Sequence, residues 1–134
     1  MDAKDFVSTI YLGDRACKGI EIDTWAAEVS VQVDVISRVR SADGNWNFYT
    51  DEDVENGRLV FTNVKKIFLD QNGYLPNDLI NSLEAIDQKD GTYCFLLSVC
   101  SVMDEPQGQE AVIKIIAEGI ALRDPLKPDV LVID

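Results

Sequence analysis

The stretch "VSVQVDV", residues 29–35, decides the fold class of this chain. Valines occupy its odd positions, and the polar residues Ser30, Gln32 and Asp34 fall between them. Successive side chains of a β-strand point to opposite faces, so this pattern predicts a strand with one buried and one solvated side. Such alternation is typical of antiparallel sheets that pack one face on a core.

Two shorter strand patterns flank this stretch. "CKGIEID", residues 17–23, places Ile20 and Ile22 on one face, and "WNFYT", residues 46–50, is a short aromatic run. An Asp-Gly dipeptide before the aromatic run is a turn signal between two strands. The first fifty residues therefore predict consecutive strands joined by tight turns.

Two longer patterns follow. "RLVFTNVKKIFLD", residues 58–70, predicts a long strand, and its alternation breaks at "TNVKK", residues 62–66, which predicts a bulge or bend. "TYCFLLSVCSV", residues 92–102, is apolar on both faces. A strand with two apolar faces is expected in the middle of a sheet that is covered on both sides.

Residues 110–124 fit a strand better than a helix, because isoleucine is frequent and a glycine lies inside the run. Ile113 and Ile115 share one parity, whereas Ile120 lies on the other. A bulge at Gly119 would let all three face the core, and we predict one there. A helix is the competing interpretation.

One segment favours a helix, and the tail favours a strand. "LPNDLINSLEAI", residues 75–86, begins with a proline and has aliphatic residues at helical spacing: Leu79, Ile80, Leu83 and Ile86. The tail carries "VLVI", residues 130–133, after two prolines. We expect this tail to add an edge strand or to dock on a partner.

Together these patterns predict a mainly β protein. We expect residues 1–134 to form a single domain, an antiparallel β-sandwich or partly open barrel of about six to eight strands with one short helix.

Charge is the strongest feature of the composition. Twelve Lys and Arg residues face 24 Asp and Glu residues, which gives a net charge of -12. Such a surface repels phosphates and disfavours nucleic acid, whereas it attracts a basic protein and speeds the encounter. No apolar run approaches the ~20 residues of a membrane helix, and the N-terminus lacks the pattern of a secretory signal. We therefore expect a cytoplasmic protein without membrane contact.

The residue types present restrict the chemistry. The chain has no histidine, so Ser-His-Asp and Cys-His catalysis and histidine-ligated metals are excluded. The three cysteines show no C-x-x-C spacing, and we expect reduced thiols that pack as small apolar side chains. No phosphate-binding glycine loop occurs. We predict a non-enzymatic protein with no cofactor and no metal.

Two acidic segments are candidate partner contacts. "TDEDVENG", residues 50–57, does not fit an EF-hand, which needs a closing glutamate where this chain has Thr62. The second segment is "MDEPQGQE", residues 103–110. The candidate contact residues of the two segments are Asp51, Glu52, Asp53, Glu55, Asp104 and Glu105.

The Gly13-Asp14-Arg15 triplet and Trp25 complete the candidates. Gly13 permits a positive φ, Asp14 suits a turn, and Arg15 can pair with an acid, all of which describe a chain that turns into a strand. The functional interpretation places Asp14 and Arg15 on a rim that contacts a partner. Trp25 follows polar residues, and an exposed tryptophan beside acids is typical of interaction hot spots.

The chain resembles a group of small bacterial β-rich proteins of unknown function. The pieces that carry this resemblance are "YLGDRACKGIEID", "RLVFTNVKKIFLD", "LPNDLI" and "IIAEGIALRD", which together cover most of the chain. Some similar families are immunity proteins, which bind and block a bacterial toxin. The resemblance implies a binding role and carries over no catalytic residues.

Three hypotheses follow. The first is a binding module for a basic protein partner, in the manner of an immunity protein. The second is a small-ligand-binding or carboxylate-based enzyme domain that uses the mouth of the barrel or sandwich, and it requires a cleft of several hundred Å³. The third is a structural subunit in which "VLVI" completes a homodimer.

Overall fold

A computed structural model describes residues 1–39, 53–101 and 109–134 of the chain. It is mostly β, with antiparallel sheets of three and seven strands and one short helix in these residues. The elements are α1 (Ala3–Ser8), β1 (Ile10–Tyr11), β2 (Cys17–Asp23), β3 (Glu28–Val33), β4 (Val35–Arg38), β5 (Val54–Glu55), β6 (Arg58–Phe68), β7 (Ile80–Asp87), β8 (Tyr93–Ser101), β9 (Gln109–Arg123) and β10 (Leu131–Val132).

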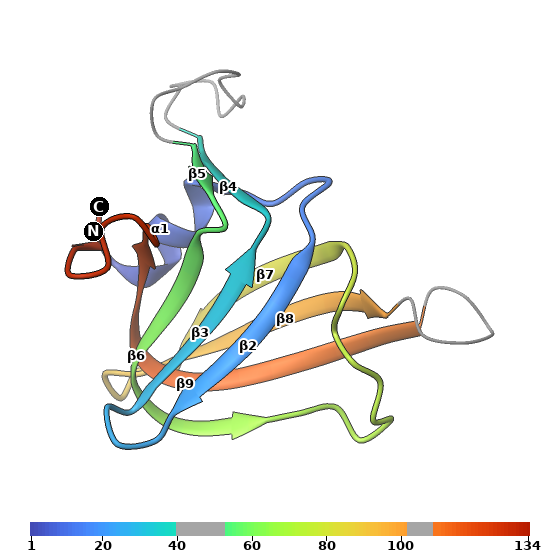
Figure 1. The fold of residues 1–134 in the computed structure, drawn as a ribbon. Helices are drawn as coiled ribbons and strands as arrows, with labels where there is room; N and C mark the ends of the chain where they lie inside the picture. The colour runs from blue at the N-terminus through green and yellow to red at the C-terminus, as the bar shows by residue number, and fades with distance from the viewer. Residues whose placement is uncertain (40–52, 102–108) are drawn as a thin grey trace.

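The large sheet has the order β2-β3-β6-β9-β8-β7, and β10 pairs with β9 beside this path. Figure 1 shows that the long strands β6 and β9 curve strongly, so that the two halves of the sheet face each other across the core. The small sheet, in the order β1-β4-β5, stands at one end of the molecule. This arrangement confirms the predicted mainly β, sandwich-like architecture without a closed barrel in the described residues.

The curvature has a local cause in β6. Asn63 has a φ of 51°, and the register against β9 shifts between Val64 and Lys66. The side chains of Leu59 and Phe61 face the core, and the next core-facing residue is Val64, three positions later instead of two. This change confirms the irregularity predicted in residues 62–66. The extra twist of a bulge lets one strand serve both halves of the sheet.

The core-facing residues of β9 also skip one position, because Ala117 is followed by Ile120, three positions later. However, the pairing of β9 with β6 runs without a slip through Gly119, so the predicted bulge at Gly119 is wrong. The strand instead bends together with β6, and a side chain at Gly119 would approach Thr62 Oγ1 to 3.0 Å. Glycine therefore fits the close contact at the bend.

Residues 29–35 do not form one strand. The backbone leaves the large sheet after Val33 and joins the small sheet at Val35, with Asp34 between them. The Asp34 carboxylate accepts the N–H groups of Ala16 and Val35, each at 2.9 Å. A side chain that binds two backbone donors stabilises the corner. The core-facing positions change there, from Val33 to Ile36, and Val35 is half-buried.

The predicted helix at residues 75–86 is also wrong, because residues 80–87 form β7, paired with β8. The register shifts between Ile80 and Ser82, so the core-facing residues Ile80 and Leu83 are three positions apart. A bulge thus produces the i, i+3 spacing of a helix. The one helix described is α1 instead, where Asp2 Oδ1 accepts the N–H of Asp5 at 2.8 Å as an N-cap.

Two other predictions concern β8 and the tail. β8 lies inside the sheet, between β7 and β9, and the side chains of Phe95, Leu97 and Val99 are fully buried, but its other face is only partly covered, because Leu96 and Cys100 are half-buried. The tail adds β10 to the edge of β9. The predicted strand at residues 46–50 lies outside the described residues. No helix in residues 1–39, 53–101 and 109–134 has the length and apolar character needed to cross a bilayer.

Candidate functional site

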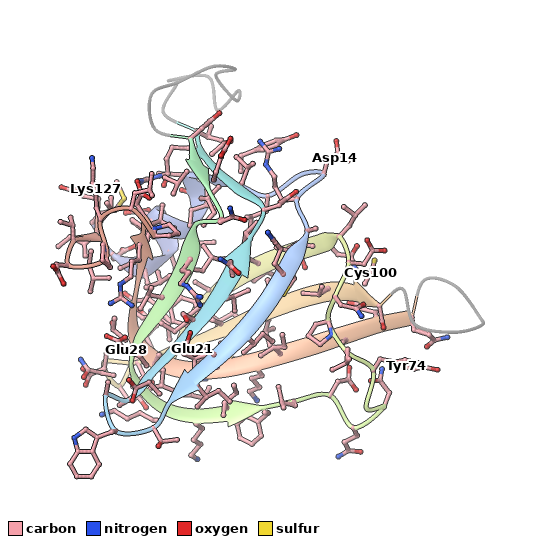
Figure 2. The ribbon with its side chains drawn as sticks, viewed as in Figure 1. Asp14, Glu21, Glu28, Tyr74, Cys100 and Lys127 are labelled. Carbon is pink, nitrogen blue, oxygen red and sulfur yellow. The ribbon has the colours of Figure 1, made fainter. Side chains whose placement is uncertain are left out.

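The Gly13-Asp14-Arg15 triplet forms a tight turn. The N–H of Arg15 donates to the carbonyl of Leu12 at 3.1 Å, and the residue with positive φ is Asp14, at 55°, rather than Gly13. A side chain at Gly13 would come within 2.7 Å of the Tyr11 hydroxyl, so glycine is needed for the close approach of the ring. Asp14 points into solvent at the tip of the turn (Figure 2).

Arg15 is held against the protein. Its Nη2 donates to Ser37 Oγ at 2.9 Å, and the guanidinium carbon lies 5.6 Å from the centre of the Tyr11 ring. A cation over an aromatic face is stabilised electrostatically. Of the predicted pair, Asp14 is therefore exposed, whereas Arg15 is half-buried.

The turn and the acidic segment before β6 lie at the same end of the molecule, joined through Asp34. Asp34 accepts the N–H of Ala16 with its side chain and the N–H of Asn56 with its carbonyl, the latter at 2.8 Å. The exposed residues Asp53 and Glu55 immediately precede Asn56. The structure thus brings Asp14, Asp53 and Glu55 to one end.

The remaining candidates do not join this group. Trp25 is fully exposed in the turn between β2 and β3, at the other end of β2 from Asp14. Four candidates, Asp51, Glu52, Asp104 and Glu105, lie outside the described residues. The predicted contact residues therefore do not form a single site among the residues that the structure describes.

The described arginines are turned inward. Arg38 is buried, with its Nε and Nη2 donating to Thr9 Oγ1 at 3.1 and 2.8 Å and its guanidinium 4.9 Å from the Phe6 ring centre. Arg15, Arg58 and Arg123 are half-buried. Most of the described carboxylates are exposed, and so are the described lysines, so the acids outnumber the bases at the surface as the composition indicates.

Arg58 and Arg123 form an ionic cluster on the outer face of the large sheet that the sequence did not reveal. The two residues are register partners on β6 and β9, and like charges in such positions repel. Glu21 Oε2 lies 3.2 Å from Arg58 Nη1, and Glu28 Oε2 lies 3.7 Å from Arg123 Nη1. Figure 2 shows Glu21 and Glu28 side by side on β2 and β3. The acids offset the repulsion and leave little net charge to bind an anion.

A second polar network lies on the outer face of β7, β8 and β9. Ser98 Oγ donates to Glu110 Oε1, Asn81 Nδ2 donates to Ser98 Oγ at 3.3 Å, and Cys100 Sγ donates to Asn81 Oδ1 at 3.3 Å. The groups satisfy one another across three neighbouring strands. Ser98 is buried at the base of this network and presents little surface to a substrate.

The two edges of the large sheet, β2 and β7, meet across a seam that is closed at one end. Ala16 and Leu79 form an antiparallel bridge. Beside it the N–H of Cys17 donates to the carbonyl of Asp78 at 3.0 Å, and the N–H of Ile80 donates to the carbonyl of Arg15 at 2.8 Å. Figure 1 shows the connection from β6 to β7 crossing near β2 at this point.

Further along β2 the seam opens into a groove of about 430 Å³, which we call the seam groove. Ile113, 1% exposed, lines it from the core, and the aliphatic side chains of Ile22, Leu69 and Leu75 line it while remaining 47%, 61% and 60% exposed. Its other lining residues are Ile20, Asp70, Gly73, Tyr74, Pro76 and Ala111. The groove is mostly apolar, and Figure 2 shows Tyr74 on the connection that forms its far side.

Two groups in the part of the chain that the structure describes have shifted pKa values. Burial raises the pKa of the Cys17 thiol, against a smaller opposing effect of a backbone hydrogen bond at Gly19. The side-chain hydrogen bond from Thr92 lowers the pKa of Asp90, an exposed turn residue. A buried thiol with a raised pKa is a poor nucleophile. Among residues 1–39, 53–101 and 109–134, no group of three or more His, Cys, Asp or Glu side chains is placed to hold a metal ion.

The fold and these sites define an acidic, mainly β domain with an open seam. The chain belongs to a family of unknown function, DUF6258, which matches residues 1–134. Comparisons with curated proteins and with solved structures find no match.

Proposed function

We propose that this chain is a non-enzymatic protein-binding module whose partner is basic. The observation that carries the proposal is the excess of exposed acids: most of the described carboxylates face solvent and outnumber the exposed lysines, whereas the described arginines are turned inward. The net charge of -12 is therefore carried mainly by exposed side chains. Such a field steers a basic protein into contact and repels acidic ones.

The acidic end of the molecule is the expected first contact. Asp14 lies there on a tight, hydrogen-bonded turn and Glu55 on β5, with Asp53 beside it, so the charges of Asp14 and Glu55 are presented from a hydrogen-bonded backbone. The particular role that the sequence resemblance suggests is that of an immunity protein, in which the module covers the basic face of a toxin. A nuclease toxin would present such a face, because its substrate carries phosphates. We expect a cytoplasmic location on this basis.

The test begins with immobilised full-length protein in an extract of its source organism, followed by identification and purification of the captured partner. The affinity of the purified pair is then measured as the salt concentration rises past about 0.1 M, where the Debye length is about 10 Å. We expect the affinity to fall steadily, mainly through a slower association rate. The variant pair Asp14→Asn with Glu55→Gln should slow association several-fold.

Asp90→Asn is the control, because it removes one exposed carboxylate from the turn between β7 and β8, at the other end of β7 from the Ala16–Leu79 bridge. It should change the association rate far less than the pair at the acidic end. An affinity that is indifferent to salt, or a partner with an acidic contact face, would contradict the proposal. So would the failure of any protein to bind the purified chain.

A second candidate is the binding of a small apolar ligand in the seam groove. The volume of about 430 Å³ and the mostly apolar lining are typical of small-molecule sites. Extraction of the purified protein with organic solvent, followed by mass spectrometry, would detect such a ligand. A stoichiometric compound would favour this candidate.

A further inference from the structure

We propose that an extended segment of a partner protein occupies the seam groove and pairs with β2 as an added strand. This inference rests on the proposed protein-binding function and specifies how the partner is held. Its basis is the position of backbone hydrogen-bonding groups beside apolar side chains, which is the arrangement that strand addition requires.

The free backbone groups of β2 follow from the register. The N–H of Val33 donates to the carbonyl of Gly57 at 2.9 Å, so alternate residues of β3 bond toward β6. The intervening residue Ser30 bonds toward β2, where its register partner is Glu21. Ile20 and Ile22, on either side of Glu21, therefore turn their N–H and C=O groups toward the seam.

The closed end of the seam shows that this edge of β2 accepts a strand. Cys17 already donates its N–H to the chain across the seam, at Asp78. Beyond that point the crossing chain contains Pro76, which has no N–H to donate. The ladder stops there, and the edge at Ile20 and Ile22 is left for an incoming segment.

The seam groove supplies the side-chain contacts. Because Ile20 and Ile22 line the groove, alternate side chains of an added strand would point into it beside Leu75 and above Ile113. Exposed aliphatic side chains around a hollow of this size are typical of an interaction site. The segment would therefore carry apolar residues at every second position.

The charge on the outer face of β2 determines which residues we expect at the positions of the added strand that point away from the groove. Glu21 and Asp23 are exposed and alternate with the groove-facing isoleucines. Cross-strand neighbours of opposite charge stabilise a sheet. The expected partner sequence thus alternates Lys or Arg with Val, Ile or an aromatic residue.

The same charges argue against a second copy of this chain as the occupant. Antiparallel pairing of two β2 edges with Ile20 of each copy opposite Ile22 of the other would place Glu21 opposite Glu21, which is destabilising. Each copy also carries a net charge of -12. A small apolar molecule would fill the groove but would leave the backbone groups of Ile20 and Ile22 without a strand partner.

The experiment selects binders from a displayed library of random peptides long enough to span β2, with the full chain as bait. We expect enrichment of the alternating basic and apolar pattern. Hydrogen exchange with a selected synthetic peptide should slow at the Ile20 and Ile22 amides at least about tenfold. Leu75→Glu should weaken the peptide at least about tenfold, whereas Leu126→Glu, at a side chain 90% exposed outside the groove, should not.

The other outcomes separate the two proposals. Peptides that bind without slowing exchange at Ile20 and Ile22 would overturn strand addition and leave the binding function standing. If no peptide is enriched, or if the amides are protected only when the chain dimerises, strand addition by a partner is wrong. The salt dependence of the purified natural pair then tests the binding function by itself. Binding of an apolar dye but no peptide would assign the groove to small molecules.

Discussion

The two ends of β2 meet the same crossing chain in different ways. At the Cys17 end the backbones pair, with Cys17 bound to Asp78 and Ile80 bound to Arg15. At the Asp23 end they separate, and apolar side chains line the space between them. The contrast shows that this sheet edge pairs beside Cys17 and that the pairing ends where the crossing chain contains Pro76, which has no N–H to donate.

The largest expected effect is on the free energy of unfolding, which should fall much more for a substitution at the bottom of the seam groove than for one at its rim. Ile113→Ala removes a side chain that is 1% exposed and belongs to the core, and it should lower the free energy of unfolding by about 2–5 kcal/mol. Leu75→Ala, at a side chain 60% exposed, should change it by less than about 0.5 kcal/mol. Urea unfolding followed by circular dichroism measures both. Equal losses would mean that the rim belongs to the core and is not a binding surface.

The next effect concerns the closed end. Asp34→Ala would leave the half-buried N–H groups of Ala16 and Val35 without their acceptor, and the loss of a typical hydrogen bond costs about 0.5–1.5 kcal/mol. Asp34→Asn keeps one oxygen in place and should cost clearly less. Hydrogen exchange at Ala16 should accelerate in the alanine variant. If both variants unfold at the same urea concentration as the parent protein, Asp34 does not stabilise the corner.

Much of the fold could be predicted from local pattern, because burial on one face leaves a two-residue period in the sequence. The central strand at residues 92–102 and the irregularity at residues 62–66 are examples. The period fails where a bulge changes it: Ile80 and Leu83 mimic a helix although they lie in β7. It also cannot show that the valine run divides at Asp34 between two sheets, because Val35 continues the sequence pattern although the core-facing residue after the corner is Ile36.

The candidate site was less predictable, for a different physical reason. Each acidic residue could be named from the sequence, but which of them share an end of the molecule depends on hydrogen bonds such as those of Asp34. The seam groove joins residues of β2 to residues 69–76, and the Arg58–Arg123 pair joins β6 to β9. These contacts depend on strand order and register. The exposed isoleucine of "CKGIEID", Ile22, is the one local signal that could have indicated an unfilled surface.

The smallest expected effect is a pH dependence of the free energy of unfolding, which arises from Cys17 at the closed end of the seam. Burial raises the pKa of the Cys17 thiol above its ordinary value near 9.0, so the unfolded chain releases this proton at lower pH than the folded chain. The stability that the protonated Cys17 thiol contributes is therefore complete below pH 9.0 and is lost as the pH rises through the raised pKa. The free energy of unfolding falls by about 1.4 kcal/mol per pH unit at most. Urea unfolding of the parent protein and Cys17→Ala, under reducing conditions from pH 7 to pH 10, measures the difference. The variant starts from lower stability but lacks this loss, so the two curves should converge toward high pH. Parallel curves would show that Cys17 ionises as readily in the folded chain as in the unfolded one, and that the closed end of the seam admits water as the open end does.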